Sequence, residues 1–171
     1  MSLAYDAMLF AREVHKTQVR KYSGNPYADH LAEVAGIVAT VDTSAETIAT
    51  AWLHDSREDQ GISGEEIEAR FGMRVAVGVA LLSDLERGNR ATRKALSRER
   101  LASAPGWVQS IKCADLISNT SSIVQHDPQF AKVYLEEKSL LLEVLTKADP
   151  RLLALAKAQA APALPVSPPA A

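Results

Sequence analysis

The sequence predicts an all-α fold, because apolar residues recur at helical spacing through most of the chain. Two absences support this prediction. No segment alternates apolar and polar residues as a half-buried strand does, and the sequence contains neither an internal repeat nor a glycine-rich phosphate loop. With 171 residues, the chain is long enough for one domain with a substantial core and too short to expect two.

The composition limits the classes of function. The net charge is only −2, so broad electrostatic binding to nucleic acid or to an anionic membrane surface is not expected. No apolar stretch is long enough to cross a bilayer, and the N-terminus lacks an apolar signal core. The single cysteine, Cys113, excludes an intramolecular disulfide and favours an intracellular protein, which we expect to be cytoplasmic.

The first half of the chain predicts three helices. An amphipathic pattern covers residues 3–20 and should end near Lys21, before the turn residues 22–26. A second helix should begin around Ala28 or Asp29. Ser44 is a suitable N-cap for a third helix, which should run through the apolar residues 48–53 into the acidic cluster 55–59.

The second half predicts a series of further helices. Ser63 and Glu66 form a capping-box pattern that opens a short helix. Apolar helices are then expected over residues 75–85, 107–124, 130–145 and 150–158, giving about eight to nine helices in one domain of residues 1–158. Residues 159–171 are rich in alanine and proline and carry no charge, so we expect this C-terminal tail to be extended.

Residues 86–100 form the most basic part of the chain. The simpler interpretation is a solvated helix face with a connecting loop. The functional interpretation is a wall that faces a phosphate group, or a lid over a substrate. The sequence alone favours the simpler one.

Four residues are candidate metal ligands. His54 and Asp55 are adjacent at an expected helix end, His30 follows the turn at Pro26, and Asp115 is an isolated carboxylate in an apolar helix. Two imidazoles and two carboxylates suit manganese, iron or zinc, and the carboxylates also allow magnesium. Each residue alone has a simpler explanation, such as an ion pair between Asp115 and Lys112.

Further polar residues accompany these candidates. Asp115, Asn119 and Ser122 fall on one face of a largely apolar helix and need polar partners. Glu58 and Asp59 lie one helical turn beyond His54 and Asp55, where they could accept protons. The cluster at 54–59 would then divide into metal ligands and groups that handle water.

The motifs and their order resemble the HD superfamily of metal-dependent phosphohydrolases. More narrowly, residues 4–158 resemble the hydrolase domain of RelA/SpoT-type proteins and the small alarmone hydrolases. The matching residues are Phe10-Ala11, His15, Gln18, Arg20-Lys21, Ser23 to Tyr27, His30, Ala51 to Asp55, Glu58-Asp59, Phe71-Gly72, Ile111 to Asp115, Asn119, Tyr134-Leu135 and Glu137-Lys138.

This resemblance implies an HD-domain helical bundle and a set of roles. His30, His54, Asp55 and Asp115 would hold a divalent metal, usually Mn²⁺ in this family, and Glu58 and Asp59 would position or deprotonate the attacking water. The implied substrate contacts are Arg20 against the base, Lys21 and Ser23 nearby, Asn119 and Ser122 at the ribose and phosphates, and Lys132 at a phosphate. The implied reaction removes pyrophosphate from the 3′ position of ppGpp or pppGpp and leaves GDP or GTP.

Several residues depart from the family pattern. Leu31, Arg57 and Gln60 replace common family residues near the expected ligands, and Ile117-Ser118-Asn119 stands where Leu-His-Asn is more usual. None of these changes removes a metal ligand, so they bear on the substrate more than on the chemistry. Two alternatives therefore stay open: an HD-type phosphohydrolase for another nucleotide, such as ppApp, or for a phosphorylated cofactor, and a catalytically silent protein that binds metal or nucleotide. The sequence does not predict the oligomeric state.

Overall fold

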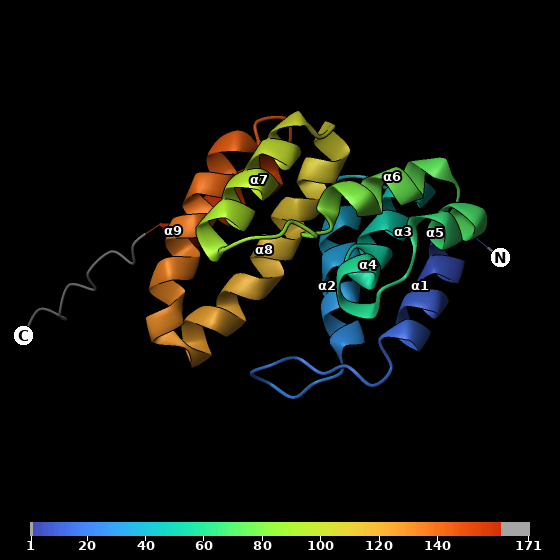
Figure 1. Cartoon of the computed structure of the whole chain (residues 1–171), viewed down its shortest axis with the longest axis horizontal. Helices are drawn as coiled ribbons and strands as arrows, with labels where there is room; N and C mark the ends of the chain where they lie inside the picture. The colour runs from blue at the N-terminus through green and yellow to red at the C-terminus, as the bar shows by residue number, and fades with distance from the viewer. Residues whose placement is uncertain (1, 162–171) are drawn as a thin grey trace, which may run out of the picture.

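The computed structural model describes residues 2–161, and over this range it is all-helical, as predicted (Figure 1). Ten helices occur in chain order: α1 Leu3–Val14, α2 Tyr27–Ala39, α3 Ala45–Leu53, α4 Ser56–Gln60, α5 Gly64–Phe71, α6 Met73–Leu82, α7 Arg90–Ser103, α8 Gly106–His126, α9 Pro128–Val144 and α10 Pro150–Ala160. This is at least one helix more than predicted. No helix in the described range combines the length and the apolar character needed to span a membrane.

The predicted caps are confirmed. The Ser44 hydroxyl accepts a hydrogen bond from the Thr47 N–H at the start of α3, and the Ser63 hydroxyl accepts one from the Glu66 N–H at the start of α5. These bonds satisfy backbone donors that have no partner inside the helix. Short polar side chains at these two positions therefore set where the helices begin.

The first expected helix is too long in the prediction, because α1 ends at Val14 rather than near residue 20. His15 turns inward and stacks on the Tyr27 ring at 5.3 Å between centroids. The following segment then pairs with the start of α2: the Arg20 N–H donates to the Asn25 carbonyl, and the Tyr27 N–H donates to the Gln18 carbonyl. These backbone bonds replace the helical ones that the periodicity predicted.

The third expected helix is divided. The helix α3 ends at Leu53, residues 54 and 55 form a turn, and the short α4 carries Glu58 and Asp59. Gly61 adopts a positive φ of 66° and ends α4, a conformation that favours glycine. The division separates the two ligand candidates His54 and Asp55 from the two acids that follow.

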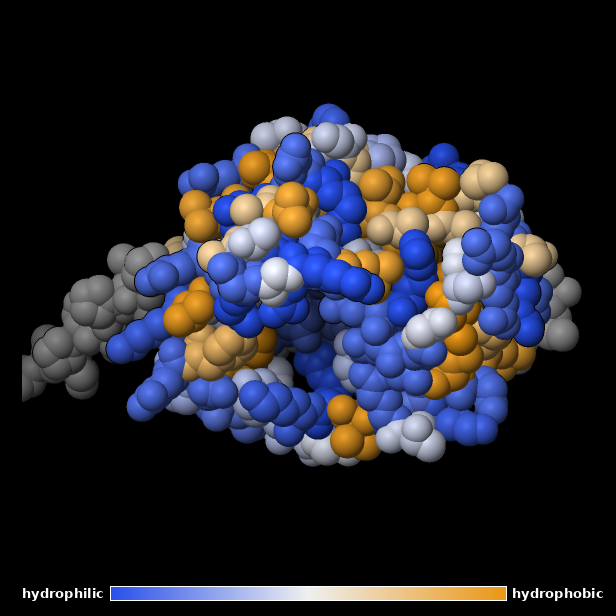
Figure 2. All heavy atoms as spheres, in the orientation of Figure 1, coloured by the Kyte–Doolittle hydropathy of each residue, from blue (hydrophilic) through white to orange (hydrophobic). Residues whose placement is uncertain are grey.

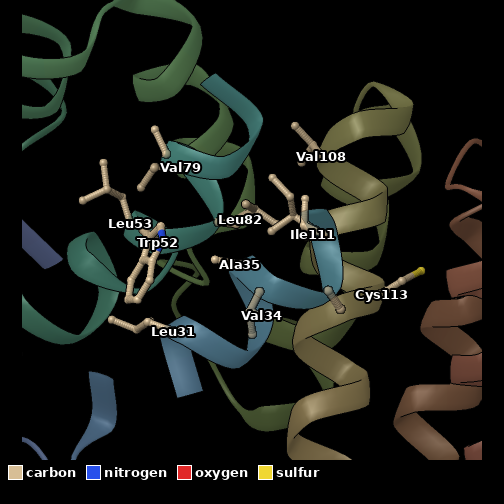
Figure 3. Close-up of a cluster of buried hydrophobic side chains, with 14 of the residues drawn as sticks. Leu31, Val34, Ala35, Trp52, Leu53, Val79, Leu82, Val108, Ile111 and Cys113 are labelled. Atoms are coloured by element: carbon tan, nitrogen blue, oxygen red, sulfur yellow. The ribbon is translucent and has the colours of Figure 1, made fainter. Parts of the chain in front are cut away.

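The helices form an N-terminal group, α1 to α6, and a C-terminal group, α7 to α10 (Figure 1). The long helix α8 joins them, since it packs on α2, α3 and α6 on one side and on α9 and α10 on the other. Figure 3 shows the buried residues at this junction, where Val34 and Ala35 of α2 lie beside Ile111 of α8. The Cys113 side chain points toward the C-terminal helices and is fully buried.

Helix α10 continues to Ala160, two residues beyond the boundary expected at residue 158. Residues 159 and 160 therefore belong to the helical domain rather than to the tail. Of the rest of the predicted tail, Ala161 caps the end of α10, and residues 162–171 lie outside the described residues.

Candidate metal and active site

The four predicted metal ligands come together at the junction of the two helix groups. His30 comes from α2, Asp115 from the middle of α8, and His54 and Asp55 from the turn between α3 and α4. His30 Nε2 lies 3.4 Å from Asp115 Oδ1 and 3.6 Å from Asp55 Oδ2, and His54 Nε2 lies 3.0 Å from Asp55 Oδ2. Segments 85 residues apart in the sequence thus converge on one point.

These residues fit a divalent cation. His30 Nε2 and His54 Nε2 are buried and have no hydrogen-bond partner among the described residues. Both face carboxylates, so two imidazole nitrogens and two carboxylate oxygens meet in a space where a cation would satisfy all four. Ligand atoms of His30, His54 and Asp115 all lie within 4.8 Å of one another.

The charges at this point are those expected of a cation site. Burial disfavours ionisation of Asp115, but Lys112 and the two imidazoles outweigh it and hold the pKa of Asp115 well below its usual range. Burial likewise opposes the charged form of His54, yet Asp55 and Asp115 raise the pKa of His54. The carboxylates therefore stay ionised and stabilise positive charge between them.

Neighbouring side chains hold the ligands in place. The Tyr27 hydroxyl donates to Asp55 Oδ2 at 2.6 Å. The Asn119 amide donates to Asp115 Oδ1 at 2.6 Å, and the Lys112 ammonium donates to Asp115 Oδ2 at 2.9 Å. The ion pair considered from the sequence for Asp115 thus exists, and it accompanies the cluster rather than replacing it. Such bonds fix ligand orientation before a metal binds.

A cavity of about 240 Å³ opens beside the cluster. Asp55 and Asp115 line it together with Glu58 and Asp59 of α4. The Asp84 N–H donates to Glu58 Oε2 at 2.8 Å, and the Gln18 amide donates to Asp59 Oδ2 at 2.7 Å. Figure 2 shows this face hollowed between the two helix groups, with hydrophilic residues around the hollow.

Glu58 is suited to accept a proton. Partial desolvation of its carboxylate, together with the negative charges of Asp84 and Asp55, raises the pKa of Glu58 to about 7. A carboxylate with a pKa near neutrality is a stronger base than an ordinary one and is still available in its charged form.

The basic segment forms the opposite wall of the cavity. Helix α7 contributes Arg90, Lys94 and Arg98 to the lining. Arg90 makes a bidentate pair with Glu137 of α9, and Lys94 pairs with Asp84 at 3.0 Å. Within residues 2–161, Arg98 pairs with no carboxylate. The functional interpretation of residues 86–100, a basic wall, therefore describes their position better than the simpler one.

Two further cavities contain most of the predicted substrate contacts. Arg20, Ser23 and Ser122 line a cavity of about 250 Å³ between α2 and α8. Arg20, Lys21, Asn119 and Ser122 line a smaller one of about 150 Å³. Because Asn119 also lines the cavity beside the metal cluster, the three spaces adjoin.

Lys132 is the exception among the predicted contacts. It lies on the exposed side of α9 and lines none of these three cavities. Arg57, which departs from the family pattern, also lines none of them. Although Arg57 lies between Asp55 and Glu58 in the sequence, its side chain therefore does not contribute to the lining of these cavities.

Sequence reasoning gave no role to Tyr27 or Asp84, and it considered Arg98 only as part of the basic segment 86–100. Tyr27 and Gln18 belong to the motifs that resemble the family, and this membership could have indicated that they lie near the site. For Asp84 and Arg98 the only signal was the high charge density of residues 84–100. Their roles depend on how α7 packs against α6 and α9 beside the cavity, which the sequence pattern does not specify.

A family model described as HD domain matches residues 7–107, more than half of the chain. The chain belongs to the HD domain family. The match includes His30, His54 and Asp55, and the structure adds Asp115 from α8 to this HD site.

Relatives of known name agree with this assignment. The chain is 34% identical over 129 residues to a probable guanosine-3′,5′-bis(diphosphate) 3′-pyrophosphohydrolase of Synechocystis. It is 32% identical over 128 residues to the GTP pyrophosphokinase rsh of Brucella melitensis. These alignments cover 72% and 71% of this chain but only 17% of each relative. The HD domain thus corresponds to a minor part of much longer proteins.

A solved structure shares the whole fold. The HD domain aligns with a metazoan orthologue of SpoT with a TM-score of 0.85 and 23% identity, covering 93% of this chain and 94% of the other. That orthologue is described as hydrolysing ppGpp. A Listeria monocytogenes protein aligns with a TM-score of 0.68 and 21% identity, over 81% of this chain and 96% of the other.

Proposed function

We propose that this HD domain is a metal-dependent phosphohydrolase that removes pyrophosphate from the 3′ position of ppGpp or pppGpp. The observation that carries the proposal is one arrangement: Asp55 and Asp115, which lie against His30 and His54, line a single cavity together with the acids Glu58 and Asp59 and the basic residues of α7. The names of the relatives support the choice of substrate. Manganese is the proposed ion because the resemblance to RelA/SpoT-type hydrolases implies it, and the mixed imidazole and carboxylate set is compatible with it.

The roles of the residues follow from their positions. When bound, a divalent ion lowers the pKa of water and polarises a phosphoryl oxygen. Glu58 accepts the proton of the attacking water, and Asp59, held by Gln18, orients that water. Arg98 and Lys94 face the cavity from α7 and offset the negative charge of the departing pyrophosphate.

The nucleoside would occupy the adjoining cavities. Arg20 lines both of them, and a guanidinium plane can stack on a purine. Asn119 lies between these cavities and the metal cluster, where the ribose would have to lie if its 3′ substituent is to reach the acids. Lys21 and Ser23 then contact the same ligand from the loop before α2.

A substrate panel tests the proposal. The protein with MnCl₂ is incubated separately with ppGpp, pppGpp, ppApp, GTP and phosphorylated cofactors, and the products are resolved by anion-exchange chromatography. We expect pyrophosphate and GDP from ppGpp, and no turnover by an Asp55→Ala variant. Release of orthophosphate from ppGpp would contradict the proposed removal of pyrophosphate. Faster turnover of another compound would contradict the proposed substrate. Binding without turnover of any compound would identify a silent nucleotide-binding protein.

A further inference from the structure

On the side of the ring away from the cation site, His30 is held by two side chains that have no role in the mechanism proposed above. His30 Nδ1 lies 2.8 Å from Ser118 Oγ, and Ser118 Oγ donates to Glu33 Oε2 at 2.6 Å. Ser118 is 2% exposed and belongs to α8, whereas Glu33 lies on α2, one turn beyond His30. The three residues form a line that leads from the cation site to the cavity between α2 and α8.

The directions of these hydrogen bonds determine the tautomer of His30. A serine hydroxyl has one hydrogen, and here that hydrogen goes to the Glu33 carboxylate, which can only accept. Ser118 Oγ must therefore accept the other bond, so that His30 Nδ1 carries a hydrogen. In the neutral ring, the lone pair is then on Nε2, which is buried and faces Asp115 Oδ1 at 3.4 Å.

The other imidazole of the site is held differently. His54 Nδ1 lies 2.8 Å from the carbonyl oxygen of Ala51, a backbone atom of α3, the helix that ends just before His54. No side-chain substitution removes that acceptor, so the orientation of His54 does not depend on a second side chain. The orientation of His30 does depend on one, the Ser118 hydroxyl.

We infer that Ser118 and Glu33 are positioning residues that present His30 Nε2 to the metal, and that the affinity of the site for its ion depends on this pair. The inference rests on the metal site of the proposed function and adds two residues to it. Partners of this kind typically change metal affinity by about 10- to 100-fold when removed, because they fix the ring and increase its basicity.

The test is calorimetric titration of the full chain with MnCl₂, which needs no substrate. Ser118→Ala and Glu33→Ala should each weaken Mn²⁺ binding by about 10-fold or more. Ser121→Ala is the matched control, since Ser121 lies on the same helix and lines the same cavity but makes no side-chain hydrogen bond among the described residues. It should bind Mn²⁺ as the wild type does.

Thermal unfolding in EDTA separates a lost ligand from a lost fold. Glu33 is exposed, so Glu33→Ala should retain the metal-free unfolding temperature even if Ser118→Ala does not. Wild-type affinity in a folded Glu33→Ala variant would overturn the inference while leaving the metal site intact. Failure of the wild-type protein to bind any divalent ion would overturn both the inference and the proposed metal site.

Discussion

At the scale of single residues, the two acids of α4 have different surroundings. Partial burial of the Glu58 carboxylate, together with the negative charges of Asp84 and Asp55, raises the pKa of Glu58 to about 7, although the hydrogen bond from the Asp84 N–H opposes this shift. Asp59 accepts a bond from the neutral amide of Gln18. In the proposed mechanism, these two adjacent carboxylates would take separate tasks, proton acceptance by Glu58 and water orientation by Asp59, because their neighbours differ.

The first prediction concerns Glu58. Glu58→Gln should retain Mn²⁺ binding, because Glu58 is not a ligand, and should lower kcat by about 10²- to 10⁴-fold, the usual contribution of a general base. Steady-state kinetics and calorimetry measure the two effects. The matched variant Glu65→Gln, at an exposed position of α5, should behave as wild type. Unchanged turnover by Glu58→Gln would remove Glu58 from the mechanism.

The pH dependence should follow from the same group. The charged carboxylate of Glu58 is the active form, so kcat should fall as the pH is lowered through the pKa of Glu58, and the loss should vanish in Glu58→Gln. That pKa is about 7 in the metal-free protein, and a bound cation nearby lowers it. The midpoint of the acid limb should therefore lie at or below pH 7, measured at saturating metal. An acid limb that persists unchanged in the variant would assign it to another group.

At the scale of helices, α7 contributes one face to the cavity and one to solvent. Arg98 lines the cavity without an acidic partner in the described residues, whereas Arg93 of the same helix is exposed and lines none of the three cavities. The remaining basic residues of the wall are already paired with Asp84 or Glu137. A phosphate group entering the cavity would thus find Arg98 as its most available guanidinium.

The second prediction compares these two arginines. Arg98→Ala should raise KM for ppGpp by about 10-fold or more, equivalent to the loss of a charge-assisted hydrogen bond. Arg93→Ala should leave KM unchanged. Steady-state kinetics at low ionic strength make the comparison, since screening by salt weakens exposed charges. Equal effects of the two substitutions would show that α7 acts only through its overall charge.

The close packing of α6 also belongs to this scale. Gly78 has no side chain, and a Cβ built there would lie 2.8 Å from Thr50 Cγ2 of α3 and would also collide with the Trp107 ring of α8. Glycine at this position lets the three helices approach one another. Gly36 of α2, by contrast, has open space around its missing Cβ.

The third prediction uses this contrast. Gly78→Ala should reduce the free energy of unfolding by about 1–3 kcal/mol through overpacking. Gly36→Ala should raise it by about 0.5–1 kcal/mol, because alanine favours the helix interior. Urea unfolding followed by circular dichroism measures both changes. A stabilising Gly78→Ala would mean that α6 can move away from α3 and α8 at little cost.

At the scale of the whole molecule, the cation site ties together α2, the α3–α4 turn and α8. The ligands come from both helix groups, since α8 also packs on α9 and α10. Only a folded chain brings His30, Asp55 and Asp115 within reach of one ion. An ion that binds only the native state must therefore stabilise the entire domain.

The fourth prediction follows from this linkage. MnCl₂ at 100 times its dissociation constant should stabilise the fold by about 2.7 kcal/mol and raise the unfolding temperature by several degrees. EDTA should reverse the shift, and Asp55→Ala should show none. Differential scanning calorimetry with and without metal provides the measurement. A shift of equal size in Asp55→Ala would indicate binding elsewhere on the protein.

The sequence predicted local features well and tertiary features only in part. Ser44 and Ser63 were identified as caps because a cap acts within one turn of its own helix. The four candidate ligands could be singled out because each is conspicuous, being a polar residue in or beside an apolar segment; the structure brings them together, and their role as ligands stays a prediction. The turn at His54-Asp55 and the early end of α1 were missed, since both depend on contacts with distant segments. The same holds for Glu33 and Ser118, which lie 85 residues apart.

Asp84 connects helix α7 to the proposed proton acceptor Glu58. Its side chain binds Lys94 and Arg100 of α7, while its backbone N–H holds the Glu58 carboxylate. A ligand that draws α7 toward the cavity would shift the same residue that sets the position of the proton acceptor. Substrate binding and the positioning of Glu58 would then be coupled, so that water is activated when a phosphate is present for it to attack.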